Sequence, residues 1–99
     1  GTAESDSVAY LTIVTAGSLS QIVWENTTNG DKVTVASSFV NGDQIIIDGE
    51  NRRVTKNSVE IDYTGVLPKV ITGSNIFKIT LTGAGFSLSV TEIHYPRFY

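Results

Sequence analysis

The stretch NGDQIIIDGENRRVTKN, residues 41–57, decides how the rest of the chain is expected to fold. It opens with an Asn-Gly-Asp turn, continues into three isoleucines and turns again at a Gly-Glu-Asn triplet. Isoleucine is β-branched and loses little freedom in an extended strand, while Asn, Asp and Gly tolerate the positive φ of tight connections. Residues 52–56 then read as the returning strand. The stretch therefore predicts a β-hairpin with Ile45 and Ile47 on one face and Ile46 on the other.

The segments on either side of this hairpin also carry strand patterns. Predicted strands cover Val8–Thr15, Gln21–Glu25, Lys32–Ser37, Ser58–Tyr63, Ile76–Thr82 and Phe86–Tyr95. Turn signals separate them at short intervals, which is typical of an antiparallel sandwich or barrel. No window has the 3.6-residue apolar stripe of a helix. We therefore predict an all-β fold, a two-sheet antiparallel β-sandwich of about eight short strands.

In the last predicted strand, the apolar side chains change from one face of the strand to the other. Within residues 86–90 the apolar side chains alternate on one face, but Ile93 and Tyr95 fall on the opposite face. A period of two that slips by one residue predicts a β-bulge near Thr91-Glu92, or a strand that moves between the sheets.

Length and composition set limits on function. The chain has 99 residues, of which 40% are hydrophobic and 17% charged, as is ordinary for one globular domain with its own core. A formal net charge of −3 argues against nucleic acid, because phosphate binding needs clustered positive charge. The absence of cysteine removes disulfides and thiolate metal sites. No apolar run approaches the roughly 20 residues of a membrane helix, so we expect neither nucleic acid nor membrane as a partner.

The domain boundary is expected near the N-terminus. Residues 1–7 are polar and read as a linker or disordered lead-in, and residues 8–99 read as a single β-sandwich domain. The lead-in lacks the basic and apolar regions of a signal peptide. A chain that begins with Gly rather than Met fits a domain excised from a longer protein.

The sequence contains no pattern that would indicate catalysis or the binding of a cofactor. His94 is the one histidine, and no G-x-S-x-G elbow accompanies it, so a Ser-His-Asp triad is not predicted. Zinc requires three or four clustered His or Cys ligands. Residues 48–51 lack the full spacing of a calcium loop, and Glu60 and Asp62 alternate with apolar residues as any solvated strand face does. We therefore predict no enzyme activity, no catalytic residue, no metal and no cofactor.

Aromatic side chains leave a binding function open. Trp24 and the tyrosines are candidates for a sugar-stacking platform, because an aromatic ring pairs an apolar face with a polar rim; a core position for the lone Trp is the alternative. Phe98 and Tyr99 lie at the end of the chain, where large rings are hard to bury locally, and are candidates for docking on a neighbouring domain or subunit. The candidate contacts to a glycan or a protein partner are Trp24, Tyr63, Arg52, Arg53, Phe98 and Tyr99.

The order of these motifs resembles the C-terminal domain of siphophage distal tail proteins. That family shows a G-D-x-[IL]-x-I-D hairpin, a V-T-x-N segment, a Pro before a G-x-N turn, and a final strand with an aromatic and basic tail. The Ile-Thr pair before the G-x-N turn departs from the Leu-x-Pro that the family often has. Within residues 20–99, the matching positions are Gly42-Asp43, Ile45, Ile47-Asp48, Val54-Thr55, Asn57, Pro68, Gly73, Asn75 and Tyr95–Tyr99.

The resemblance implies a structural component of a phage or prophage tail tip or baseplate. Distal tail proteins form a hexameric ring between the tail tube and the host-recognition apparatus, and their C-terminal domain is a galectin-like or carbohydrate-module-like jelly roll. We therefore expect a protein–protein interaction module that carries the host-adsorption apparatus, located in the virion tail and made in the bacterial host cytoplasm. Its expected partners are other tail and baseplate proteins.

Two further expectations follow from the resemblance. The full-length protein would be a homo-hexamer, and this domain alone a monomer. The alternative function is a carbohydrate-binding module that recognises cell-surface or cell-wall glycan, which a groove with exposed aromatic rings would favour.

Overall fold

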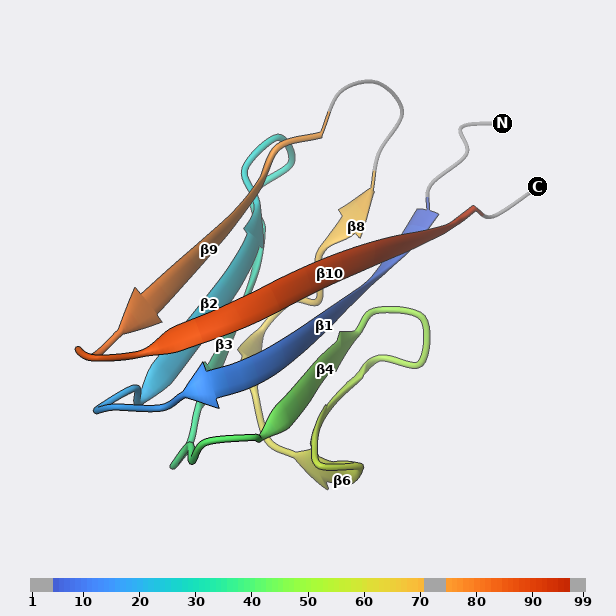
Figure 1. Ribbon diagram of the computed structural model, residues 1–99. Coiled ribbons are helices and arrows are strands. Elements are labelled where there is room, and N and C mark those ends of the chain that lie inside the picture. Colours follow the sequence, from blue (N-terminus) through green and yellow to red (C-terminus); the bar gives the residue numbers. More distant parts are fainter. Residues whose placement is uncertain (1–4, 71–74, 97–99) are drawn as a thin grey trace.

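Antiparallel strands make up the regular structure in the computed structural model of the protein, which describes residues 5–70 and 75–96 (Figure 1). This described part contains no helix that is long and apolar enough to cross a membrane. In chain order the strands are β1 (Ser5–Thr15), β2 (Gln21–Asn26), β3 (Asp31–Ala36), β4 (Gln44–Asp48), β5 (Arg53–Lys56), β6 (Val59–Ile61), β7 (Thr64–Gly65), β8 (Lys69–Val70), β9 (Phe77–Thr82) and β10 (Ser87–Pro96).

The strands form two sheets that pack face to face (Figure 1). One sheet has the order β10-β1-β4-β5-β6, and β8 also pairs with β1, beyond the end of β4. The other sheet has the order β7-β3-β2-β9. The predicted all-β fold with two antiparallel sheets is therefore confirmed.

Alternating side chains from both sheets fill the space between them. The predicted hairpin face is confirmed, because Ile45 and Ile47 are buried in the core while Ile46, on the other face of β4, is only half-buried. Burial of each such aliphatic side chain stabilises the fold by about 1.5–3 kcal/mol. The aliphatic core side chains with at most 1% exposure are Ala9, Leu11, Ile13, Ile22, Val33, Val35, Ile45, Ile47 and Val54.

The first strand is longer than the sequence predicts. β1 begins at Ser5 rather than Val8, because residues 5–7 pair with β10 on one side and Ser5 pairs with Val70 of β8 on the other. These residues therefore belong to the sheet rather than to the expected lead-in over residues 1–7. Residues 1–4 lie outside the described part, and the domain boundary stays a prediction.

The bulge predicted near Thr91-Glu92 is wrong. β1 and β10 pair in continuous register from Ser5 with Pro96 to Ile13 with Leu88, and the irregularity lies on β1, just after Ile13. In β1 the odd-numbered residues 7, 9, 11 and 13 are all buried, and Val8, the partner of Ile93, is buried as well. The continuous pairing leaves no extra residue near Thr91-Glu92.

The strand predicted over residues 58–63 is also shorter in the structure. Ser58 has a φ of 70° and lies in the turn before β6, and Val59 is 65% exposed although its alternation predicts an inward position. β6 has three residues and forms the edge of its sheet, so little of it can face the core. The chain then crosses to β7 in the other sheet.

Two polar side chains join the ends of the β4–β5 hairpin. Asp43 precedes β4 and is only 5% exposed, and Asn57 directly follows β5. Asn57 Nδ2 donates to Asp43 Oδ1 at 2.8 Å, and the Val40 N–H donates to Asp43 Oδ2 at 2.9 Å. Asn57 also accepts from Gln44 N through its Oδ1 at 2.9 Å and donates its own N–H to Gln44 O at 2.8 Å. We call this group the Asp43–Asn57 clamp.

The clamp favours the ionised form of its carboxylate. The pKa of Asp43 lies below its ordinary value of 3.8 because the Val40 N–H and the Asn57 side chain donate to the charged oxygens. Burial of the carboxylate opposes this shift, and the charge of Lys56 adds to it. Asn57 holds a φ of 51°, a left-handed conformation that Asn adopts more readily than most residues. Sequence reasoning found both residues as turn and motif positions but not their mutual contact.

Substitution of Asn57 separates the contribution of its side-chain hydrogen bonds from that of its left-handed backbone conformation. Asn57→Gly keeps the left-handed conformation but removes the clamp hydrogen bonds, so we expect a loss of about 1–3 kcal/mol in the free energy of unfolding. Asn57→Ala adds the cost of a left-handed non-glycine residue, about 1–2 kcal/mol more. Urea unfolding measures both values. Ser58→Gly is the matched control, because Ser58 has a φ of 70° and its side chain makes no hydrogen bond within the described residues, and it should not destabilise. Wild-type stability of Asn57→Gly would contradict the clamp.

Candidate binding cleft

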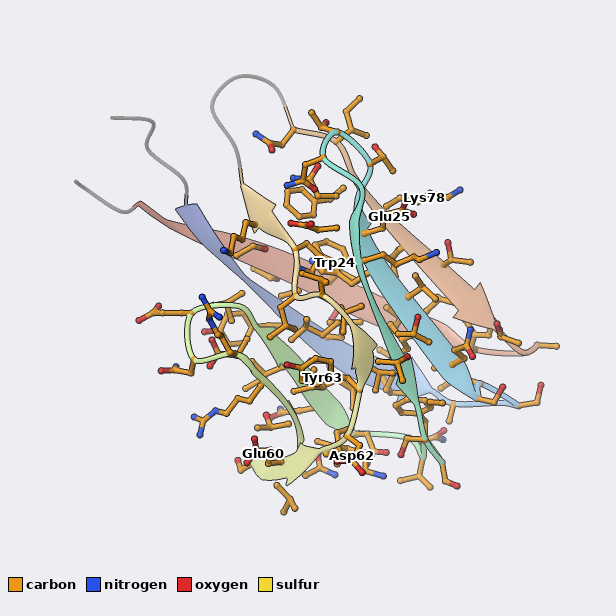
Figure 2. All side chains as sticks on the ribbon, turned by 180° about the vertical axis from the view of Figure 1, so that it is seen from behind. Trp24, Glu25, Glu60, Asp62, Tyr63 and Lys78 are labelled. Carbon is orange, nitrogen blue, oxygen red and sulfur yellow. The ribbon has the colours of Figure 1, made fainter. Side chains whose placement is uncertain are left out.

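A cleft of about 230 Å³ opens between the β4–β5 turn and the segment that connects β6 to β8. Figure 2 shows Tyr63 on this segment, beside the β4–β5 hairpin. Tyr63 and Lys69 are half-buried, Arg52 and Val66 are exposed, and Leu67 is buried in the core. The lining residues are Gly49 and Arg52 from the turn, and Tyr63, Gly65, Val66, Leu67 and Lys69 from the connecting segment.

The turn side of the cleft is held by a buried carboxylate. Asp48 accepts two hydrogen bonds from Asn51, one from its backbone N–H at 3.0 Å and one from Nδ2 at 2.9 Å. The Gly49 N–H donates to Ser7 O of β1 at 2.9 Å, and a Cβ at residue 49 would approach that oxygen to 2.5 Å. Arg52 follows with a φ of 55°. The turn therefore presents Arg52 from a backbone that is fixed to two strands.

The connecting segment is held by two asparagines of the β2–β3 hairpin. The fully buried Asn26 donates from Nδ2 to Lys69 O at 2.7 Å, and Asn29 Nδ2 donates to the same oxygen at 3.1 Å. The Lys69 N–H in turn donates to Asp31 Oδ2 at 3.3 Å. Gly65 pairs with Val33 in the β7–β3 ladder and has a φ of 93°. Both walls of the cleft are thus fixed by hydrogen bonds within the sandwich.

The cleft combines positive charge with one aromatic ring. Arg52 and Lys69 are cations, Tyr63 supplies the ring and a hydroxyl, and no Asp or Glu is among the lining residues. Asp48, which lies next to the cleft in sequence, is engaged by Asn51 and lies 3.8 Å from Arg53 Nε. Such a surface can attract an anionic group and hold a small apolar one beside it.

The structure brings together two of the residues that the sequence singled out. Tyr63 and Arg52 line the cleft, whereas Arg53 lies on β5, outside the lining, near Asp48. Phe98 and Tyr99 lie outside the described residues. Sequence reasoning missed Lys69 and its neighbours in the connecting segment, because no local pattern marks them; only the pairing of β7 with β3 and of β8 with β1 places them here.

Trp24 lies in the core rather than at a surface. Its side chain is 6% exposed and lies between the two sheets (Figure 2). Its ring stacks on that of Phe77 with centroids 5.2 Å apart and planes 20° from parallel. This is the alternative that the sequence left open for the lone Trp. A buried indole offers no face to a sugar.

Among the described residues, the acidic side chains form no cluster that could hold a metal ion. Glu60 and Asp62 are both exposed at one end of the molecule (Figure 2). Asp62 lies at a second hollow of about 160 Å³ that Tyr63 also lines. Within residues 5–70 and 75–96, no three His, Cys, Asp or Glu side chains come together in a way that could hold a metal ion.

The chain resembles one known protein family along nearly its whole length. The model of the family described as siphovirus-type tail component, C-terminal domain, matches residues 1–95. No curated protein and no solved structure gives a significant match to this chain.

The burial of the lone Trp is open to a direct test. Because Trp24 is the only tryptophan, acrylamide quenching of its fluorescence reports its access to solvent. We expect weak quenching in the folded chain and a several-fold increase after unfolding in urea. Glu60→Ala, which changes an exposed side chain outside the core, should leave the quenching of the folded chain unchanged. Equal quenching of the folded and unfolded chains would show that Trp24 is exposed.

Proposed function

The chain belongs to the family of siphovirus-type tail component C-terminal domains, and from this premise we propose that it is a protein–protein interaction module of a distal tail protein. Membership makes it a structural component of a phage tail. The proposal adds that the module carries the host-adsorption apparatus by binding other tail or baseplate proteins. It also holds that the chain is not an enzyme, that the full-length protein is a homo-hexamer made in the host cytoplasm, and that this domain alone is a monomer.

The observation that carries the proposal is that the residues of the family motif hold the fold together. Two residues that match the family pattern, Asp43 and Asn57, bind each other and the backbone next to them. Ile45 and Ile47 of the same motif fill the core, and Asp48 caps the following turn. A motif whose members are engaged in this way supports a rigid scaffold rather than a reactive centre.

The surface is suited to contact with proteins. β9 and β10 each form an edge of their sheet within the described residues, and they adjoin through the Gly83–Gly85 turn (Figure 1). Sheet edges offer unpaired backbone groups to a partner. Apolar side chains are also exposed at scattered positions, and the most exposed of them are Val14, Val40, Val59, Val66 and Ile76.

Binding of glycan is the weaker alternative. Trp24 is buried, and Tyr63 is the one aromatic residue that lines the cleft. A sugar site needs aromatic faces together with convergent polar side chains that read hydroxyl groups. The amide side chains near the cleft, Asn26, Asn29 and Asn51, are bonded to backbone or to neighbouring side chains.

A paired binding experiment tests the proposal. The purified chain is mixed with each tail-tip and baseplate protein of the same phage or prophage and analysed by size-exclusion chromatography with light scattering, and it is applied in parallel to a glycan array. We expect a complex with at least one tail protein and a glycan signal no higher than that of an unrelated β-sandwich of similar pI. Binding of glycan without binding of any tail protein would favour the carbohydrate-binding alternative.

Variants can then locate the contact. A lysine at an exposed apolar position adds charge and bulk where a partner would pack, without changing the core. One such variant should weaken the complex strongly while the others leave it intact. Suitable substitutions are Val14→Lys, Val40→Lys, Val59→Lys and Ile76→Lys.

A further inference from the structure

The cleft beside the β4–β5 turn carries positive charge in an acidic chain. The chain has a formal net charge of −3, yet the charged residues that line this cleft are Arg52 and Lys69. Glu50 and Asp62 adjoin lining residues in the sequence and are exposed, but neither is among the residues that line the cleft. Asp48 accepts hydrogen bonds from Asn51, and Asp31 accepts from the Lys69 N–H.

Arg52 has no hydrogen bond or ion pair within the described residues, although its neighbour Arg53 lies 3.8 Å from a carboxylate oxygen of Asp48. Its backbone is nevertheless fixed, because the turn that holds it is closed by Asn51 and anchored to β1 through Gly49. A guanidinium on a fixed backbone has less freedom to lose when it binds an anion, which raises affinity.

The shape and chemistry of the cleft select the class of ligand. A volume of about 230 Å³ suits one side chain or one small ring. A planar guanidinium matches a carboxylate with two parallel hydrogen bonds, and the lining residues Tyr63 and Lys69 of the opposite wall each carry a further donor group. The apolar part of the lining, Val66 and Leu67, can cover the methylene groups of an acidic side chain.

We infer that this cleft binds a carboxylate side chain, Glu or Asp, of a partner tail protein. The inference rests on the proposed function, since it names the chemical group of the partner that the module would hold. A carboxylate of an acidic sugar has the same charge, but the lining contains no Asn, Gln, Asp or Glu side chain to accept from sugar hydroxyls and only one aromatic ring. The protein carboxylate therefore fits the lining better.

Titration with small probes tests the inference. The probes are the blocked tripeptide acetyl-Gly-Glu-Gly-amide, its Gln counterpart and glucuronic acid, and backbone amide shifts of the ¹⁵N-labelled chain are followed by NMR. We expect the Glu peptide to shift the amides of Arg52, Gly65, Val66 and Lys69, and the Gln peptide to leave them in place. Added salt should weaken the effect, because the attraction is between exposed charges.

Variants within the same turn provide the control. Arg52→Gln keeps the length of the side chain and removes its charge, and should weaken binding of the Glu peptide by at least about tenfold. Arg53→Gln removes a neighbouring charge that does not line the cleft, and should bind the Glu peptide nearly as wild type does. Unchanged Trp24 fluorescence confirms that both variants are folded.

Three results would overturn the inference. These are no shift with the Glu peptide, equal binding by Arg52→Gln and wild type, or binding of glucuronic acid in place of the peptide. Failure here is distinct from failure of the proposed function. If a tail protein binds wild type and Arg52→Gln equally well, the interaction module stands and the carboxylate cleft does not.

Discussion

The hydrogen bond from Asn57 Nδ2 to the Asp43 carboxylate joins the two ends of the β4–β5 hairpin, whose strand β4 pairs with β1 inside the larger sheet. The adjacent backbone is bound to β1, since the Ile13 N–H donates to Asp43 O and the Gly42 N–H donates to Ile13 O. The Asp43 side chain thus joins the ends of the hairpin, while the backbone of residues 42 and 43 ties the same point to β1. A hydrogen bond to a charged group contributes about 1.5–3 kcal/mol, a large share of the stability of a domain of this size.

This constraint connects the fold to the proposed function. At one end of the hairpin is the clamp, and at the other is the turn that carries Arg52 to the edge of the cleft. The hairpin is rigid because its inward side chains are fully buried and its ends are bonded to β1. A module that links other proteins in a tail must keep them in a fixed relative position. A β-sandwich whose hairpin is held by these hydrogen bonds is rigid enough to do so. The same bonds leave Asp43 and Asn57 committed to structure.

The sequence predicted what depends on local alternation and missed what depends on distant partners. The hairpin face with Ile45 and Ile47, and the two-sheet fold, follow from a period of two and from turn residues. The expected bulge in β10 was wrong because β10 pairs with β1 in continuous register through Thr91 and Glu92, and local alternation does not reveal the partner strand. Val59 is exposed because β6 lies at a sheet edge, which alternation alone does not reveal. Lys69 joins Arg52 only through strand pairings far apart in the chain.

The dependence of the free energy of unfolding on pH, at acid pH, tests the clamp most directly. The pKa of Asp43 is lower in the folded chain than its ordinary 3.8, so ionised Asp43 contributes stability above that pH, and the contribution is lost as the pH falls through the lower, folded value. The free energy of unfolding is measured from pH 7 to pH 2 for wild type, Asp43→Asn and the exposed control Asp62→Asn. We expect wild type to exceed Asp43→Asn above pH 3.8 by a margin that shrinks below it, while Asp62→Asn follows wild type. A margin that stays constant across this range would show that the charge of Asp43 does not hold the hairpin.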